Sequence, residues 1–165
     1  MPATNTAGLF YPLTKMNFFV QVDGINAMAA FNEVTGIEAT VDVIEFRQGN
    51  AHSLAPVKIQ GLVKHGNVTL KMGYTRNQQF KVWMMDCVNE RRKETVRKDI
   101  TIELIDIVAK DSPATAVTAV TDATLTWILK NAWVTKYTGV DLNSSNSEVA
   151  IESVEIAYEE LVIPN

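Results

Sequence analysis

Apolar and polar residues alternate along most of the chain, a pattern typical of β-strands with one buried face. The clearest example is VTLKMGY at 68–74, where Val, Leu, Met and Tyr occupy alternate positions. Similar patterns predict strands at 18–22, 30–34, 37–46, 57–60, 99–107, 125–134 and 149–162. Short strands between turns of Gly, Asn and Asp indicate a mainly-β fold, an antiparallel barrel or sandwich with long inter-strand loops.

One segment has a helical period instead. Between residues 78 and 89, apolar residues recur at the spacing of the buried face of an amphipathic helix: Phe80, Trp83, Met84, Cys87 and Val88. Three basic residues follow at 91–93, where positive charge suits the C-terminal end of a helix dipole. The sequence therefore predicts one α-helix, about 78–89, flanking the sheets.

In three predicted strands the apolar residues change face partway along. The changes fall within 37–46, 99–107 and 149–162. Alternation decides which face of a strand is buried, so each change indicates a β-bulge or a strand end that packs on something else. Three changes together favour a second packing surface supplied by another subunit. The candidate inter-subunit residues are Ile44, Phe46, Ile105, Ile107, Val149 and Ile151.

Two connections are longer than a hairpin requires. Residues 110–124 are small and Thr-rich, without charge runs, and are predicted to form a flexible surface loop. The other connection, 47–56, combines polar groups with apolar residues, a mixture suited to contact with a partner. Its candidate contact residues are Arg47, Gln48, Gly49, Asn50, His52, Leu54 and Pro56.

Length and composition limit the remaining possibilities. A chain of 165 residues fits a single domain, 1–165, in which 1–16 are expected to form an N-terminal arm. A formal net charge of −4 argues against sequence-specific nucleic-acid binding, which needs a concentrated basic face. No apolar run is long enough to anchor the chain in a membrane, and no signal peptide is recognised. We therefore expect assembly in a reducing cytoplasm, without an internal disulfide, because Cys87 is the single cysteine.

Motifs for chemistry are missing from the sequence. The two histidines, His52 and His65, do not occur in HxH or HExxH patterns, and there is no CxxC, GxGxxG or phosphate-binding loop. No catalytic, cofactor-binding or metal-binding residue is predicted. We therefore expect that the protein is not an enzyme and binds no cofactor. The alternative from the residues alone is a monomeric β-barrel that binds a small ligand in an apolar cavity.

The order of motifs resembles the tail tube proteins of contractile phage tails and phage-like contractile injection systems. The most specific segments are FNEVTGI, EFRQGN, GLVKHGNVTLK, NAW and EVAIESVEIA. Together they extend from about Phe18 to Leu161, which is nearly the whole chain. Type VI secretion ring proteins share the architecture, but the segments EFRQGN and KHGNVTLK resemble the phage-like group more closely.

The resemblance implies a passive structural role. Tube proteins of this family form hexameric rings that stack into a hollow conduit inside a contractile sheath. The implied partners are other copies of the chain, the sheath, the baseplate or spike, the terminator, and a cargo of effector protein or DNA in the lumen. The resemblance also implies that the 47–56 loop contacts the next ring. The particle would be a phage tail or an injection device, extracellular after release.

Overall fold

A computed structural model describes residues 18–25, 31–50, 52–73, 78–89, 96–105, 123–140, 142 and 149–164. The described part of the chain is built almost entirely from β-strands, with one helix. The elements are β1 (Phe18–Val22), β2 (Phe31–Thr35), β3 (Ala39–Phe46), β4 (Val57–His65), β5 (Val68–Gly73), α1 (Gln78–Asn89), β6 (Lys98–Ile105), β7 (Ala123–Thr138), β8 (Ile151–Ala157) and β9 (Glu160–Val162).

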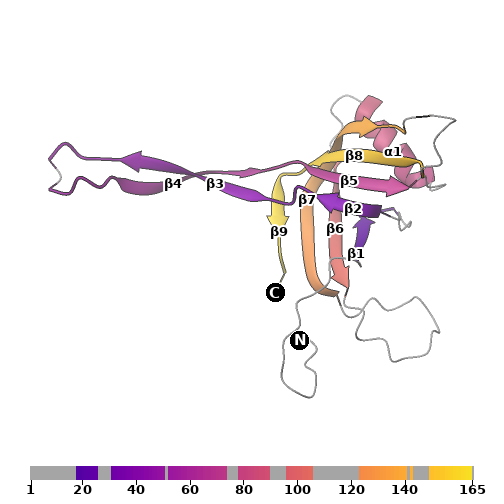
Figure 1. Ribbon diagram of the computed structural model, residues 1–165, viewed down its shortest axis with the longest axis horizontal. Coiled ribbons are helices and arrows are strands. Elements are labelled where there is room, and N and C mark those ends of the chain that lie inside the picture. Colours follow the sequence, from indigo (N-terminus) through magenta and orange to yellow (C-terminus); the bar gives the residue numbers. More distant parts are fainter. Residues whose placement is uncertain are drawn as a thin grey trace, which may run out of the picture.

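The strands form a body and a separate two-stranded hairpin. In the body, the order is β1-β6-β7-β8-β5-β2, with β9 pairing to β7, and every pairing is antiparallel. Figure 1 shows β8, β5 and β2 running across β1, β6 and the first part of β7, so that the two halves of the sheet face each other. The hairpin of β3 and β4 extends away from this body.

The hydrophobic core lies between the two halves of the sheet. Alternate residues of β5 and β8 supply one side, as the period-two pattern predicts, and β1 and β6 supply the other. Helix α1 adds Phe80, Trp83 and Met84, and the Trp83 indole donates a 2.7 Å hydrogen bond to the Val96 carbonyl. The largest fully buried side chains are Phe80, Leu70, Met72, Ile100, Ile102, Leu129, Ile156, Val68 and Val154.

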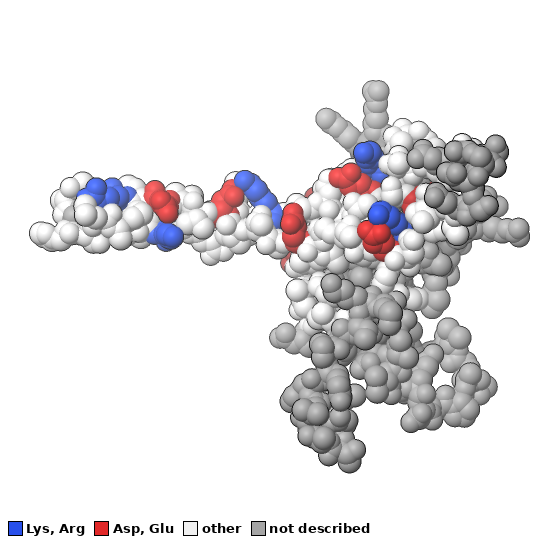
Figure 2. All heavy atoms as spheres, viewed as in Figure 1, with Lys and Arg blue, Asp and Glu red and all other residues white. Residues whose placement is uncertain are grey.

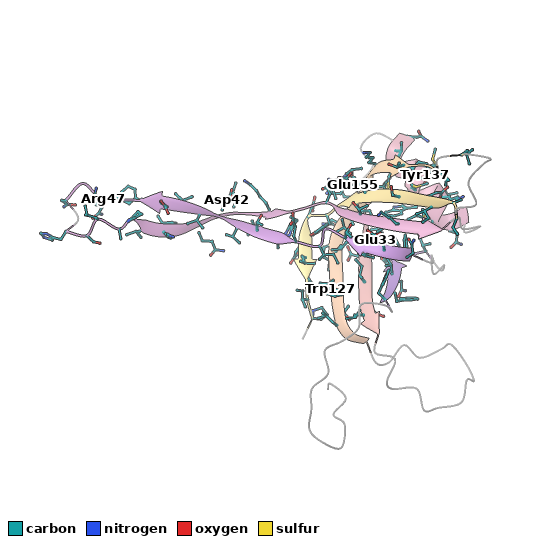
Figure 3. All side chains as sticks on the ribbon, viewed as in Figure 1. Glu33, Asp42, Arg47, Trp127, Tyr137 and Glu155 are labelled. Carbon is teal, nitrogen blue, oxygen red and sulfur yellow. The ribbon has the colours of Figure 1, made fainter. Side chains whose placement is uncertain are left out.

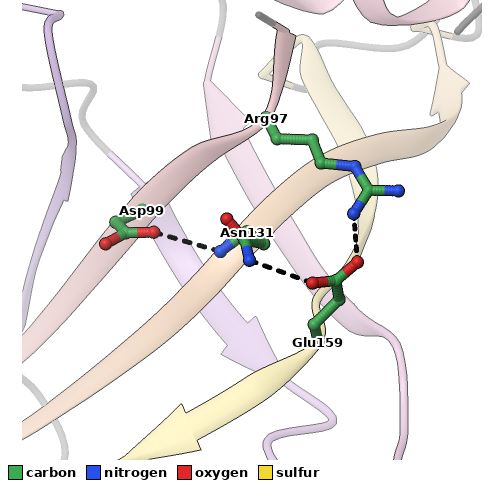
Figure 4. A network of polar contacts seen from close by, with 4 residues as sticks. All are labelled: Arg97, Asp99, Asn131 and Glu159. Atoms are coloured by element: carbon green, nitrogen blue, oxygen red, sulfur yellow. Dashed lines mark hydrogen bonds and ion pairs between the residues drawn. The ribbon is translucent and has the colours of Figure 1, made fainter. Parts of the chain in front are cut away.

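The long strand β7 links the two halves by changing partners just after Asn131. Its first part pairs with β6 and β9, and from Trp133 onwards it pairs with β8. Asn131 has a positive φ of 51°, and its side chain donates a hydrogen bond to the Glu159 carboxylate. Figure 4 shows the same carboxylate paired with Arg97, whose guanidinium also lies 4.5 Å from the centre of the Trp133 ring. Polar contacts therefore hold the corner where the sheet turns.

The predicted fold class is confirmed: the chain is mainly β and antiparallel, with one helix at 78–89. Within the described residues the sheet stays open, with β1 and β2 at its edges, and does not close into a barrel. The prediction that Val88 belongs to the buried face of the helix is wrong: its side chain is 53% exposed and does not pack in the core. The strand predicted at 57–60 continues to His65, and β7 begins at Ala123, inside the segment expected to be a loop.

Several expectations concern residues outside the described ranges. They are the N-terminal arm at 1–16, residues 110–122 of the predicted flexible loop, and Ile107. The backbone of Ile105 ends β6, where the pairing with β7 shifts register between Leu104 and Ile105. The predicted change of face in this strand therefore coincides with an irregularity, as a β-bulge would produce.

Candidate assembly interface

The β3–β4 hairpin is the most prominent feature outside the core, and we call it the arm. It comprises Ala39–Phe46, the connection 47–56 and Val57–His65. Nine residues of β4 extend for roughly 30 Å. Figure 1 shows the arm projecting from the body with its tip far from the core. Two-stranded hairpins are at best marginally stable alone in water, so this arm is a structure that gains from a partner.

The root of the arm is fixed by contacts that place it on the body. The Tyr158 hydroxyl donates a 2.9 Å hydrogen bond to the Glu38 carbonyl, and the His65 ring lies 5.1 Å from the Tyr158 ring. Gly36 has a φ of +88°, and a Cβ there would collide with the Asn67 carbonyl oxygen. Since glycine adopts this conformation without strain, it lets the chain leave β2 and enter the arm.

Both faces of the arm carry exposed apolar side chains. Partners in an antiparallel ladder share a face, so Val41 lies beside Val63, and Ile44 beside Ile59 on the opposite face. The exposed fractions are large for such residues: Val41 44%, Val43 61%, Ile44 54%, Phe46 53%, Val57 64%, Ile59 49%, Leu62 74% and Val63 54%. Exposed apolar surface of this extent marks an interaction site.

Each half of the arm also has a polar face. Near the body, Lys64 pairs with Asp42 at 2.7 Å, on the face opposite Val41. Near the tip, Lys58 lies 3.9 Å from Glu45, on the face opposite Ile44. All four charged side chains are about half exposed or more, so these ion pairs keep one face of each half wet and add little stability.

The seven predicted contact residues of the 47–56 connection lie at the tip of the arm. All seven are exposed, and Leu54 is 85% exposed. Figure 3 shows Arg47 at the far end of the hairpin, beyond Asp42. The structure thus brings Arg47, Gln48, Gly49, Asn50, His52, Leu54 and Pro56 together at one end of the molecule.

The predicted inter-subunit residues fall in two different places. Ile44 and Phe46 lie on the arm, on the face that β3 and β4 share near the tip. Val149 and Ile151 lie before and at the start of β8, where they are 78% and 42% exposed. They are separated from the buried face of β8, as the change of face in the sequence predicted.

Metal-binding side chains do not cluster in the described part of the chain. No set of three or more His, Cys, Asp or Glu residues there could hold a metal ion. Cys87 is half-buried, and burial raises the pKa of its thiol, which fits a packing role. Among the described residues, no helix has the length and apolar character to cross a membrane.

One buried acid was missed by sequence reasoning. Glu152 continues the inward-facing series of β8 and is only 6% exposed. Its Oε1 accepts a 3.0 Å hydrogen bond from the Tyr137 hydroxyl, whereas Oε2 has no partner among the described residues. Burial is the largest cause that raises the pKa of Tyr137, followed by the hydrogen bond to Glu152. The pair lies at the margin of the core and is not part of a wider reactive cluster.

The apolar residues of β4 were also missed as interface residues. In VKIQGLVKH, Val57, Ile59 and Val63 occupy alternate positions, and the bulge at Gly61 and Leu62 moves Val63 to the face opposite Ile59. The alternation through position 63 was the signal that could have extended the strand and identified these residues as partners of β3. An open sheet, an arm without a core of its own and exposed apolar surface together define a structural protein that associates with other chains.

Comparisons with known proteins identify the family. The sequence matches the family described as T4-like virus tail tube protein gp19 over residues 14–162. The chain therefore belongs to the T4-like virus tail tube protein family. It is a structural inner-tube subunit and not an enzyme, as the sequence motifs predicted. A search of curated proteins gives no match.

Solved structures share the fold over nearly the whole chain. A chain of the sheath–tube complex of an extracellular contractile injection system, PVC, in its extended state is 23% identical, with a TM-score of 0.74, and the match covers 98% of this chain and 99% of that chain. A chain of the tube-terminating cap of the anti-feeding prophage, AFP, is 21% identical, with a TM-score of 0.74 and coverage of 96% and 97%. An Hcp protein is more distant, at 14% identity, a TM-score of 0.51 and coverage of 88% and 90%.

Proposed function

We propose that this chain forms hexameric rings that stack into a hollow tube inside a contractile sheath. The observation that carries the proposal is the arm, whose tip exposes Leu54 at the end of a hairpin that its own body leaves uncovered. A contact between different patches of identical subunits, repeated along an axis, builds a tube instead of a closed dimer. In this assembly, the 47–56 tip contacts a subunit of the next ring.

The open edges of the sheet support lateral association within a ring. β1 and β2 end the six-strand path, and each pairs on one side only among the described strands. Unpaired strand edges invite pairing with another chain, and closing them between subunits removes that hazard. We propose that exposed residues near strand ends, including Val149 and Ile151, contact the neighbouring subunit when these edges are covered.

The proposed partners follow from the proteins that share the fold. Matching chains come from a sheath–tube complex, from a sheath and tube terminator, and from a baseplate. We therefore expect this chain to contact a sheath protein, a terminator and a baseplate or spike, and to carry an effector protein or DNA in its lumen. Assembly in the bacterial cytoplasm, within a phage tail or an injection particle, fits this role.

The tip contact is tested by a charge placed on Leu54. Leu54→Asp should leave the subunit folded, because the side chain is 85% exposed, and should abolish stacking of rings. Ser53→Asp is the matched control: it puts the same charge one residue away without removing an apolar side chain. Negative-stain microscopy and sedimentation report the result. Tubes of normal length from Leu54→Asp would contradict the role of the tip.

A further inference from the structure

The two apolar faces of the arm combine into one surface. The apolar residues near the body, Val41, Val43 and Val63, share one face of the ladder. Nearer the tip, Ile44, Phe46, Val57 and Ile59 share the opposite face. In a flat hairpin these two sets would point in opposite directions, and no single partner surface could cover both.

The ribbon, however, turns over between the two halves. In Figure 1, β4 lies above β3 next to the body and below β3 near the tip, so the strands exchange places along the arm. Because the ribbon turns over, the apolar face of the tip half points to the same side of the arm as the apolar face of the half near the body. Figure 2 agrees, because acidic and basic atoms of both halves are seen on the same side of the arm.

A β-bulge stands at the point of the change. Val41 pairs with Val63 and Val43 with Gln60, so two residues of β4, Gly61 and Leu62, lie opposite Asp42. A bulge increases the local right-handed twist, which favours the turn of the ribbon. Gly61 permits the close approach, because a Cβ at this position would lie 2.9 Å from the Asp42 carbonyl oxygen. The change of face in the sequence is thus matched to the twist of the backbone.

We propose that the arm is an amphipathic ribbon whose single apolar side docks flat on one other copy of this chain, with its ion-paired side turned to water. This inference rests on the proposed tube and names the surface that joins its subunits: Val41, Val43, Val63, Ile44, Ile59 and Phe46. Leu62, in the bulge, lies where the ribbon turns.

The observations favour a second copy of this chain as the partner that covers the apolar side of the arm. The arm projects away from its own body, which therefore leaves this side uncovered. Every subunit carries the same marginally stable hairpin, so every subunit needs a permanent cover for it. The subunit of a self-assembling tube supplies that cover in equal number. A mainly apolar stripe, in which Gln60 lies beside Val43, suits a lasting contact better than a transient one.

Charges on the two sides of the arm test the proposal. Val41→Asp and Ile59→Asp place a carboxylate on the apolar side, in the base and tip halves respectively. Each should lower the yield of tubes by at least about tenfold, since each buries a charge in place of a buried aliphatic side chain. Thr40→Asp and Lys58→Asp are the matched controls on the polar side, one residue away on the same strands. They should stay within about twofold of the native yield, because exposed ion pairs contribute little.

A mixing experiment identifies the occupant. A Val41→Asp subunit keeps the surface that receives an arm, so adding it in small amounts to native subunits should shorten their tubes. Its melting temperature should match that of the native subunit, because the arm lies outside the core.

Different results overturn different statements. If Val41→Asp stops assembly before rings form while Ile59→Asp gives rings that do not stack, the two halves contact different copies and the single-sided proposal is wrong. It is also wrong if all four variants form normal tubes, and a loss of sheath binding in such tubes would name the sheath as the occupant. In both cases native tubes would still support the proposed function. That function fails if the native chain itself forms neither rings nor tubes.

Discussion

Asp99 accepts a 3.0 Å hydrogen bond from the backbone amide of Asn131, which lies in β7 just before that strand changes partners. The other Asp99 carboxylate oxygen accepts a 2.9 Å hydrogen bond from the Lys130 ammonium. The left-handed conformation of Asn131 is therefore held by a side chain of the neighbouring strand β6 (Figure 4). This corner sets how the two halves of the sheet face each other, and through them where the arm leaves the body.

Asn131→Ala tests the corner. Alanine tolerates a positive φ less well than asparagine, and the change also removes the hydrogen bond to Glu159, so we expect the free energy of unfolding to fall by about 1–3 kcal/mol. Asn131→Gly, which adopts the conformation freely, should recover part of that loss. Urea denaturation compares the two variants, and equal losses would show that the backbone conformation contributes nothing.

Acid should loosen the same corner. The hydrogen bond from Lys130, followed by that from the Asn131 amide, holds the pKa of Asp99 below its usual value. Hydrogen bonds from Asn131 and Arg97 likewise lower the pKa of Glu159. A carboxylate with a lowered pKa contributes stability above the unfolded-state pKa of about 4, and this contribution is lost as pH falls through the folded-state pKa.

The measurement is the melting temperature between neutral pH and about pH 3. The native chain should lose stability over this range, and Asp99→Asn should lose less, because it starts without the carboxylate. Identical pH dependence in the two proteins would contradict the role of Asp99.

Gly36→Ala should disturb the root of the arm. Alanine is strained at a φ of +88°, and its Cβ would meet the Asn67 carbonyl oxygen, so we expect a loss of about 1–3 kcal/mol in unfolding free energy. Gly49→Ala is the control at the tip, where a Cβ has no atom within 4 Å. Calorimetry should separate the two variants clearly. A Gly36→Ala protein as stable as the Gly49→Ala protein would refute the steric argument.

Tyr137→Phe removes only a hydroxyl group, but it should lower the free energy of unfolding by more than so small a change suggests. The change leaves the Glu152 carboxylate, 6% exposed, without its hydroxyl donor, at a cost of about 1–3 kcal/mol. Glu152→Gln keeps an acceptor for Tyr137 and removes the buried charge, so it should be nearly neutral or stabilising. Chemical denaturation of the two variants and of the double variant checks the coupling. A double variant whose loss equals the sum of the single losses would show that the pair does not interact.

Local periodicity predicted the body of the fold well. The alternation in 68–73 and the helical spacing in 78–89 each decide which side chains meet the core, and the structure confirms both elements. Val88 departed from the helical pattern because tertiary packing, not spacing alone, decides how wide a stripe of the helix is covered. The positive φ of Asn131 could not be predicted, because this irregularity in the middle of a long strand depends on a side-chain contact made across the sheet.

The arm illustrates a different limit. The change of face within 37–46 correctly separated Ile44 and Phe46 from Val41 and Val43, and the predicted contact residues lie together at the tip. Sequence reasoning did not join β3 to the full length of β4, because Gly61 interrupts the alternation of β4 at the bulge. The two apolar faces lie on one side of the arm because the paired strands twist around each other. The pattern of residues in one strand alone does not predict this twist.

Cryo-electron microscopy of the purified native chain tests the central claim most directly. We expect hollow tubes of stacked rings, with β3 and β4 of each subunit lying apolar side down on another copy and the Lys64–Asp42 and Lys58–Glu45 pairs facing water. Isolated subunits at all concentrations, or stacked rings in which the arms extend freely into solvent, would contradict this account.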